Sequence, residues 1–115
     1  MASAVVKSFT LIFYAPPSAV QACKKAIFAA GAGQYPGPGN YTECCWQTSG
    51  TGQFRPGAAA NPHIGTAGGE LEETPEVRVE TLVVGEDVVK SVVTALKGAH
   101  PYEEPAYHVI KLEDY

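Results

Sequence analysis

The segment from Glu76 to Gly98, EVRVETLVVGEDVVKSVVTALKG, changes its hydrophobic period once, and this change decides the fold. Up to Val84 apolar and polar residues alternate, as in a strand with one buried face. After Gly85, apolar residues recur at helical spacing: Val89, Val92, Val93 and Leu96. Glu86 and Asp87 place negative charge at the positive end of that helix, and Gly98 ends it. The segment therefore predicts a strand that leads directly into an amphipathic helix.

The rest of the chain supplies a second strand and helix of this kind and two further strands. Val5 to Tyr14 is rich in β-branched and aromatic residues and predicts a strand. Pro16 and Pro17 suit the start of a helix, which Gly31 and Gly33 end. Alternating patterns predict strands at Asn40–Ser49 and Ala106–Leu112, and the six glycines and three prolines of Gly50–Pro75 predict a 26-residue loop.

The predicted order is βαββαβ, an α+β arrangement of the ferredoxin-like kind. Two right-handed βαβ halves give a four-stranded antiparallel sheet with both helices on one face. The other face is then uncovered, and an apolar open face predicts association between copies of the chain. The residues expected on this open face are Tyr41, Cys45, Leu82, Tyr107 and Val109.

Length and composition restrict the possible functions. We expect the 115 residues to form one domain, 1–115. Eight Lys and Arg against twelve Asp and Glu give a net charge of −4, which argues against nucleic acid as a partner. The apolar run near the N-terminus is too short to span a bilayer, so we expect no membrane contact. Three cysteines without CxxC spacing indicate reduced thiols and a cytoplasmic protein.

Three blocks of sequence resemble a known family. GAHPYEEPAY (98–107), GTGQFRPGAAANPHIG (50–65) and the stretch Glu72–Val83 are similar, in the same order, to the PII/CutA-like domain found inside the NGG-interacting-factor family, the YqfO-type proteins. CutA proteins share a weaker version of the HPYE turn. The resemblance implies the PII/CutA-like fold and a homo-oligomer, most simply a trimer built around joined sheets.

The same resemblance implies that one feature of the full-length family members, their metal centre, is not expected in this chain. Full-length members of that family carry two flanking halves whose His, Asp and Glu residues hold a pair of metal ions, and neither half is present in these 115 residues. We therefore expect a stand-alone version of the inserted domain without a dinuclear metal centre. The hydrolase or cyclohydrolase activity attached to the family through that centre is not carried over.

The segment His100-Pro101-Tyr102-Glu103-Glu104-Pro105 is predicted to form a rigid corner between a helix and a strand. Each proline forces the residue before it into an extended conformation, so the helix cannot continue. Two interpretations stay open. Tyr102 packs and the two glutamates cap backbone groups or pair across a subunit boundary, or His100 and the glutamates line a pocket for a ligand or a single divalent metal ion, with His63 as a second histidine.

The segment GTGQFRPG offers a candidate ligand site. We expect Gly50, Thr51 and Gly52 to form a loop whose amide groups approach an anion, with Arg55 giving a bidentate contact to phosphate or carboxylate. The GKS or GKT ending of a P-loop is missing. In PII proteins the equivalent connection contacts nucleotides and partner proteins, so the resemblance implies a small anionic ligand or a protein partner here.

No catalytic signature is present: the sequence has no HExxH, no nucleophile elbow and no dinucleotide fingerprint. The sequence therefore favours a trimeric PII/CutA-like binding or regulatory module over an enzyme. Two alternatives remain. One is a copper- or zinc-binding protein of the CutA type that uses His100, Glu103, Glu104 and His63. The other is a small enzyme that holds a phosphorylated or carboxylate metabolite at Arg55.

Overall fold

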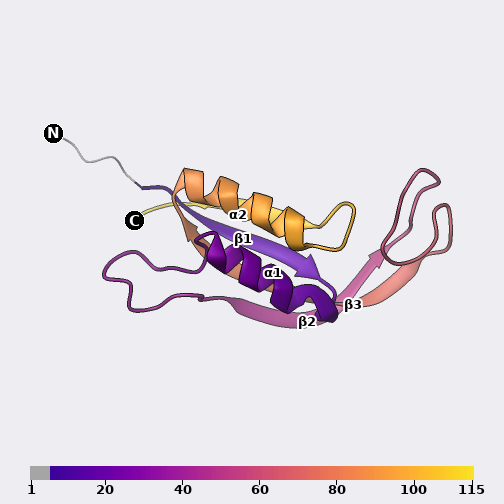
Figure 1. Ribbon diagram of the computed structural model, residues 1–115, viewed down its shortest axis with the longest axis horizontal. Coiled ribbons are helices and arrows are strands. Elements are labelled where there is room, and N and C mark those ends of the chain that lie inside the picture. The colour runs from indigo at the N-terminus through magenta and orange to yellow at the C-terminus, as the bar shows by residue number, and fades with distance from the viewer. Residues whose placement is uncertain (1–5) are drawn as a thin grey trace.

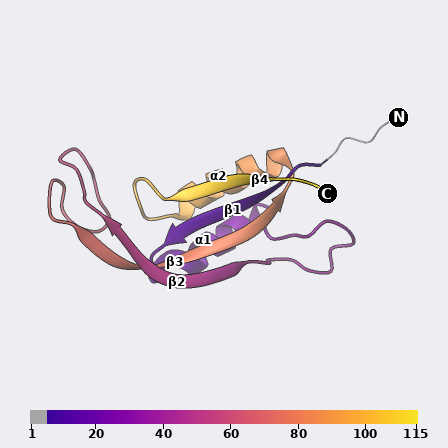
Figure 2. The ribbon, with the colours of Figure 1, turned by 180° about the vertical axis from the view of Figure 1, so that it is seen from behind.

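The computed structural model describes residues 6–115, so Val5, the first residue of the predicted first strand, lies outside the described residues. Two helices pack on one face of a four-stranded antiparallel sheet whose strands lie in the order β2-β3-β1-β4 (Figure 1). Seen from behind, the other face of the sheet has no helix over it (Figure 2). The elements are β1 (Ser8–Ala15), α1 (Pro17–Ala29), β2 (Trp46–Phe54), β3 (Glu72–Val84), α2 (Glu86–Ala99) and β4 (Tyr107–Leu112). The predicted βαββαβ fold is confirmed.

The core lies between the helices and the two central strands. Alternate residues of β1 and β3 face the helices, and the apolar residues of α1 and α2 close over them. Full burial of a large aliphatic or aromatic side chain stabilises a fold by about 1.5–3 kcal/mol. The largest fully buried side chains are Phe13, Leu11, Ile27, Leu96, Val79, Val83, Val92 and Cys23. The strand-to-helix segment that decides the fold therefore contributes four of these eight side chains.

The predicted second strand was placed too early in the chain. β2 runs from Trp46 to Phe54, and the residues from Asn40 to Cys45 form no strand. Hydrogen bonds to distant parts of the chain hold Cys44 instead: its amide donates to the Gly33 carbonyl at 2.9 Å, and the Thr81 hydroxyl donates to its carbonyl at 2.7 Å. The alternating residues 40–45 therefore form an irregular segment that is hydrogen-bonded to β3 through Thr81.

The predicted bounds of the long loop, Gly50–Pro75, are also wrong at both ends. Residues 50–54 and 72–76 pair as a two-stranded arm, and only residues 55–71 connect them. The β1–β3 ladder ends at Ala15 and Val77, so beyond this point β3 has only β2 as a neighbour. Pro75 has no amide hydrogen to donate and is tolerated on such an unpaired edge. The arm extends the molecule to 59 Å along its longest axis, against 25 and 24 Å across (Figure 1).

The open sheet face was assigned correctly for β3 and wrongly for β4. Leu82 opposes Thr10 and lies on the open face, as predicted. Tyr107 and Val109, however, oppose Phe13 and Leu11, whose side chains face the helices. Their neighbours His108, Ile110 and Leu112 take the open face in their place. A one-residue difference in register exchanges the two faces of a strand, and the alternation within β4 does not fix that register. Tyr41 and Cys45 precede β2 and belong to no strand.

Among residues 6–115, neither α1 nor α2 has the length and apolar character needed to cross a bilayer.

Gly33 should be required for the attachment of the segment before β2. Gly33 and Gly39 have nearly the same left-handed φ, +76° and +79°. A Cβ at position 33 would lie 2.7 Å from the Cys44 amide nitrogen, whereas a Cβ at position 39 would meet nothing within 4 Å. Backbone strain costs both alanine variants about 1–2 kcal/mol, and the clash costs Gly33→Ala about 1–3 kcal/mol more. Urea unfolding of the two variants measures the difference, and equal midpoints would contradict this role of Gly33.

Candidate functional site

A cleft of about 300 Å³ opens where the β2–β3 arm leaves the sheet. Its walls come from three segments that are distant in sequence: residues 53–57 at the end of β2, residues 60 and 62–64 of the connection, and residues 102–104 of the corner before β4. Tyr14, Glu76 and Ala106 complete it. The cleft thus brings together the predicted site residues Arg55, His63, Tyr102, Glu103 and Glu104.

His100 fixes the corner from inside the protein. Its side chain is buried, and ring atom Nε2 lies 2.7 Å from the carbonyl oxygen of Tyr14. Ring atom Nδ1 accepts a hydrogen bond of 3.1 Å from the amide of Tyr102. An acceptor Nδ1 means that the proton is on Nε2, which donates to Tyr14. Both nitrogens are therefore used within the fold, and neither has a free lone pair for a metal ion.

A second contact joins the corner to the connection after β2. The amide of Asn61 donates to Oε2 of Glu103 at 3.0 Å, across 42 residues of sequence. Aromatic rings gather beside this tether: the Tyr102 ring centroid lies 6.2 Å from that of Phe54 and 6.0 Å from that of His63. One predicted interpretation of Glu103, a cap on a backbone group, describes this contact, and Tyr102 stands at the centre of an aromatic cluster.

The Tyr102 hydroxyl is buried beside a carboxylate. It has no hydrogen-bond partner of good geometry among residues 6–115, although the Glu76 carboxylate is close enough to interact with it. Burial, and then the negative charge of Glu76, raise the pKa of Tyr102 to about 12. Both effects disfavour the phenolate, because it is charged and would face a second anion. At neutral pH the hydroxyl is therefore held in its protonated form.

Gly50, Thr51 and Gly52 do not form a loop. They lie in β2, opposite Glu76, Pro75 and Thr74 of β3, so their backbone belongs to a ladder. Gly52 has a different structural use: a Cβ there would collide with the side chain of Glu76. Glycine at this position leaves the space in which the Glu76 carboxylate crosses the arm.

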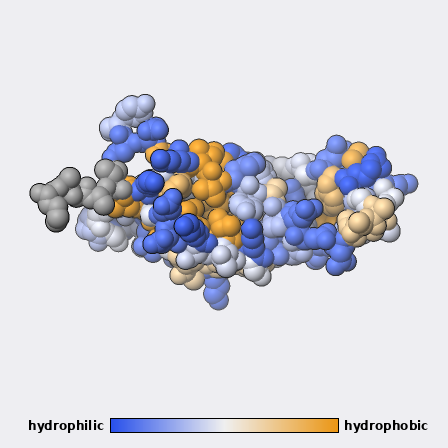
Figure 3. Space-filling view, turned by 90° about the horizontal axis from the view of Figure 1, so that it is seen from above, coloured by the Kyte–Doolittle hydropathy of each residue, from blue (hydrophilic) through white to orange (hydrophobic). Residues whose placement is uncertain are grey.

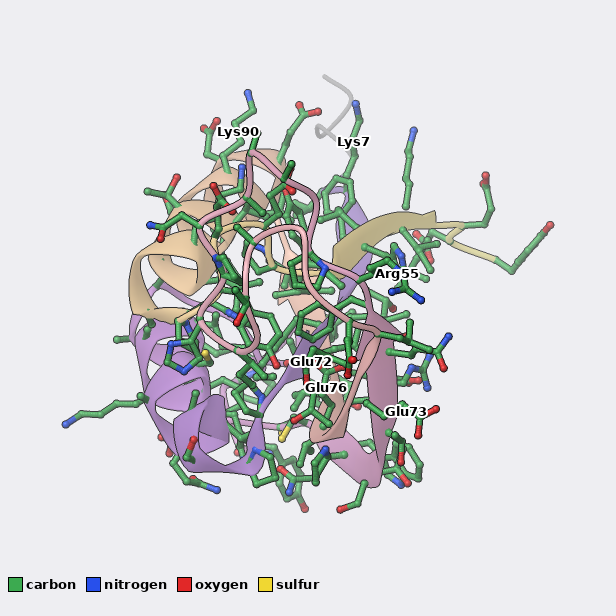
Figure 4. All side chains as sticks on the ribbon, turned by 90° about the vertical axis from the view of Figure 1, so that its right-hand side faces the viewer. Lys7, Arg55, Glu72, Glu73, Glu76 and Lys90 are labelled. Carbon is green, nitrogen blue, oxygen red and sulfur yellow. The ribbon has the colours of Figure 1, made fainter. Side chains whose placement is uncertain are left out.

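The charged groups around the cleft point in different directions. In a view onto the end of the arm, Glu72 and Glu76 point inward, whereas Arg55 and Glu73 point toward solvent (Figure 4). Arg55 is exposed and stands at the rim. Among the described residues no group of three or more His, Cys, Asp and Glu side chains is arranged to hold a metal ion.

Two residues of the cleft were missed by sequence reasoning. Phe54 lies inside the quoted GTGQFRP segment, and an aromatic residue between polar neighbours was a usable signal. Glu76 is one of four glutamates among residues 70–76, and nothing in the sequence distinguishes it from the others. Only the register that places it diagonally across from Gly52, together with the fold of the corner, brings it to Tyr102.

Comparison with known proteins places this geometry in a class. No protein-family model matches the chain. CutA1 from Oryza sativa superposes with a TM-score of 0.59 over 98% of this chain and 86% of its own, at 14% identity. Bacillus subtilis GlnK, solved as a complex with ATP, superposes with a TM-score of 0.53 over 92% of this chain and 82% of its own, at 13% identity. The chain has the PII/CutA-like ferredoxin-like fold.

Sequence similarity is stronger to one part of longer proteins. The chain is 41% identical over 101 residues to a GTP cyclohydrolase 1 type 2 homolog of Mycobacterium leprae, and 41% identical over 100 residues to that of Listeria monocytogenes. These matches cover 88% and 87% of this chain but 25% and 26% of the relatives. A Bacillus cereus protein related to NIF3 superposes with a TM-score of 0.76 at 32% identity, covering 98% of this chain and 28% of that protein.

The resemblance expected from the sequence is therefore confirmed. The chain corresponds to one PII/CutA-like segment of NIF3-related proteins and spans about a quarter of the length of the curated relatives it matches. The activity to which the relatives' name refers is that of the longer proteins, and this chain matches only part of them.

Replacing Glu76 by Gln should lower the pKa of Tyr102 without returning it to the ordinary value of about 10, because burial is the larger cause. The pKa is raised in the folded state, so protonated Tyr102 stabilises the fold fully below pH about 10, and this contribution is lost as the pH rises through about 12. The tyrosinate absorbance of the parent protein minus that of Tyr102→Phe gives the titration of this residue alone.

The matched control is Glu73→Gln, which removes a carboxylate of the same strand that points away from the cleft. An unchanged Tyr102 titration in Glu76→Gln, or an equal change in Glu73→Gln, would show that Glu76 does not act on this hydroxyl.

Proposed function

We propose that this chain is a regulatory domain that self-associates through its open sheet face and binds a small ligand in the cleft at the end of the sheet. The observation that carries the proposal is the cleft itself, because three distant segments converge on it. Its volume of about 300 Å³ lies at the lower end of ligand pockets. Aromatic walls with a few fixed polar groups are the usual lining of such pockets.

The open sheet face supports self-association. One face of the sheet has no helix over it, and three of its apolar side chains are exposed: Trp46 by 59%, Ile110 by 48% and Leu112 by 37%. Figure 3 looks down on the molecule from above the view of Figure 1, not onto the open face, and shows hydrophobic atoms among polar ones on the main body. The open face itself presents Trp46, Ile110 and Leu112. A surface of this kind is stabilised by burial against another chain. The assembly we propose is the trimer that the resemblance to PII and CutA proteins implies.

Exchanging an apolar residue of the open face for a charge should disrupt this assembly. Ile110→Glu places a carboxylate in the proposed interface, where an unpaired buried charge costs several kcal/mol, and should yield monomers at micromolar concentration. Val109→Glu is the matched control, because Val109 is the next residue of β4, is 39% exposed, and lies on the opposite side of the sheet.

Size-exclusion chromatography with light scattering gives the mass of each protein. A monomeric parent protein, or a trimer that both variants leave intact, would refute association through this face.

Ligand binding is tested by titration of the ¹⁵N-labelled protein with a panel of small molecules while amide and aromatic signals are followed. A ligand of the cleft must shift the signals of Phe54, His63 and Tyr102 before those of the open face. ATP belongs in the panel, because the GlnK structure contains it and Arg55 at the rim offers an anion one contact. Copper and zinc belong there as the second candidate, through His63 and Glu104 in the same cleft.

A further inference from the structure

The polar groups of the cleft carry more negative than positive charge. Three carboxylates line it, those of Glu76, Glu103 and Glu104, against one guanidinium, that of Arg55. Arg55 is exposed and points away from Glu76 (Figure 4). An anion inside the cleft would face the Glu76 carboxylate at short range, whereas the charges of the exposed Arg55, Glu103 and Glu104 are screened by water. The electrostatics therefore favour a positively charged occupant.

The carboxylates do not all have other tasks in the fold. Glu103 accepts the hydrogen bond from the Asn61 amide. Glu104 is exposed and forms no hydrogen bond or ion pair with residues 6–115. Glu76 crosses the arm over Gly52 and reaches the cleft beside the buried Tyr102 hydroxyl, which has no partner of good geometry. Glu104 is thus left without a partner among the described residues at the cavity wall, and Glu76 has only the Tyr102 hydroxyl beside it.

The remaining walls are aromatic. Phe54, His63 and Tyr102 lie with ring centroids about 6 Å from one another in two pairs, and all three line the cleft. The face of an aromatic ring carries partial negative charge and attracts organic cations, while the ring also buries the alkyl part of such a molecule. A bare metal ion would gain little from these walls, since hard cations prefer a full set of oxygen or nitrogen ligands.

We propose that the cleft binds a small organic cation, with an ammonium or guanidinium group at Glu76 and Glu104 and its alkyl chain against Phe54 and Tyr102. The inference deepens the proposed ligand-binding function and rests on it. It replaces the anion expected from Arg55 by a ligand of the opposite charge, because the structure places Arg55 at the rim and Glu76 inside.

Three probes of equal size separate the possible ligand classes: n-butylammonium, n-butanol and butyrate, each titrated at neutral pH and constant ionic strength into the ¹⁵N-labelled full chain. We expect n-butylammonium to shift the signals of Phe54, His63 and Tyr102 with millimolar affinity. Butanol should bind at least about threefold more weakly, as expected from the loss of one cation–π or charge contact, and butyrate should not shift these signals.

Variants test which carboxylates act. Glu76→Gln and Glu104→Gln keep the size of the side chain, and each should weaken n-butylammonium binding by about three- to tenfold. Glu73→Gln, on the same strand as Glu76 but pointing to solvent, is the matched control and should leave the affinity unchanged. The amide spectrum of each variant shows whether it is folded.

Each alternative outcome has a distinct meaning. If butyrate or ATP shifts the cleft signals and n-butylammonium does not, the cation is overturned while the proposed ligand-binding function stands. If butanol binds as tightly as n-butylammonium, the cleft recognises apolar shape and the charge proposal fails. If neither the three probes nor the wider panel shifts the cleft signals, both the cation and the ligand-binding function are wrong, and self-association stands or falls on the light-scattering result.

Discussion

The two hydrogen bonds of the His100 ring are the constraint on which the candidate site depends. One holds the end of β1 through the Tyr14 carbonyl, and the other holds the amide of Tyr102. A neutral imidazole can make both only with its proton on Nε2. The His100 side chain is buried and both bonds are partly buried, so breaking them would leave polar groups without partners and cost up to about 1–3 kcal/mol for each. The corner before β4 is therefore tied to the central strand rather than free to move.

Tyr102 connects the corner that His100 fixes to the walls of the cleft. Its ring packs against His100, with centroids 4.9 Å apart, and lies between the arm and the connection that follows it. A two-stranded arm outside a sheet is only marginally stable by itself. The contact of Phe54 with Tyr102 and the bond between Asn61 and Glu103 hold the arm against the corner. The cleft is thus formed between two parts of the chain that stabilise each other.

The fold could be read from the sequence because its core follows simple periods. The alternation in β3 and the helical spacing in α2 place Val79, Val83 and Leu96 in the core without further information. The site could be read only in part. The HPYEEP corner and GTGQFRP segment did converge, but Gly52 proved to be a strand residue that makes room for Glu76. Such a diagonal contact depends on register, which glycine-rich sequence leaves unspecified.

The most direct test is the tautomer of His100, measured by long-range ¹H–¹⁵N correlation of the imidazole nitrogens at pH 8. We expect one slowly exchanging ring with a protonated Nε2 and an unprotonated Nδ1, as the bonds to Tyr14 and Tyr102 require. A proton on Nδ1, or nitrogen shifts averaged between the two tautomers, would contradict a corner fixed by His100 and with it the preformed cleft.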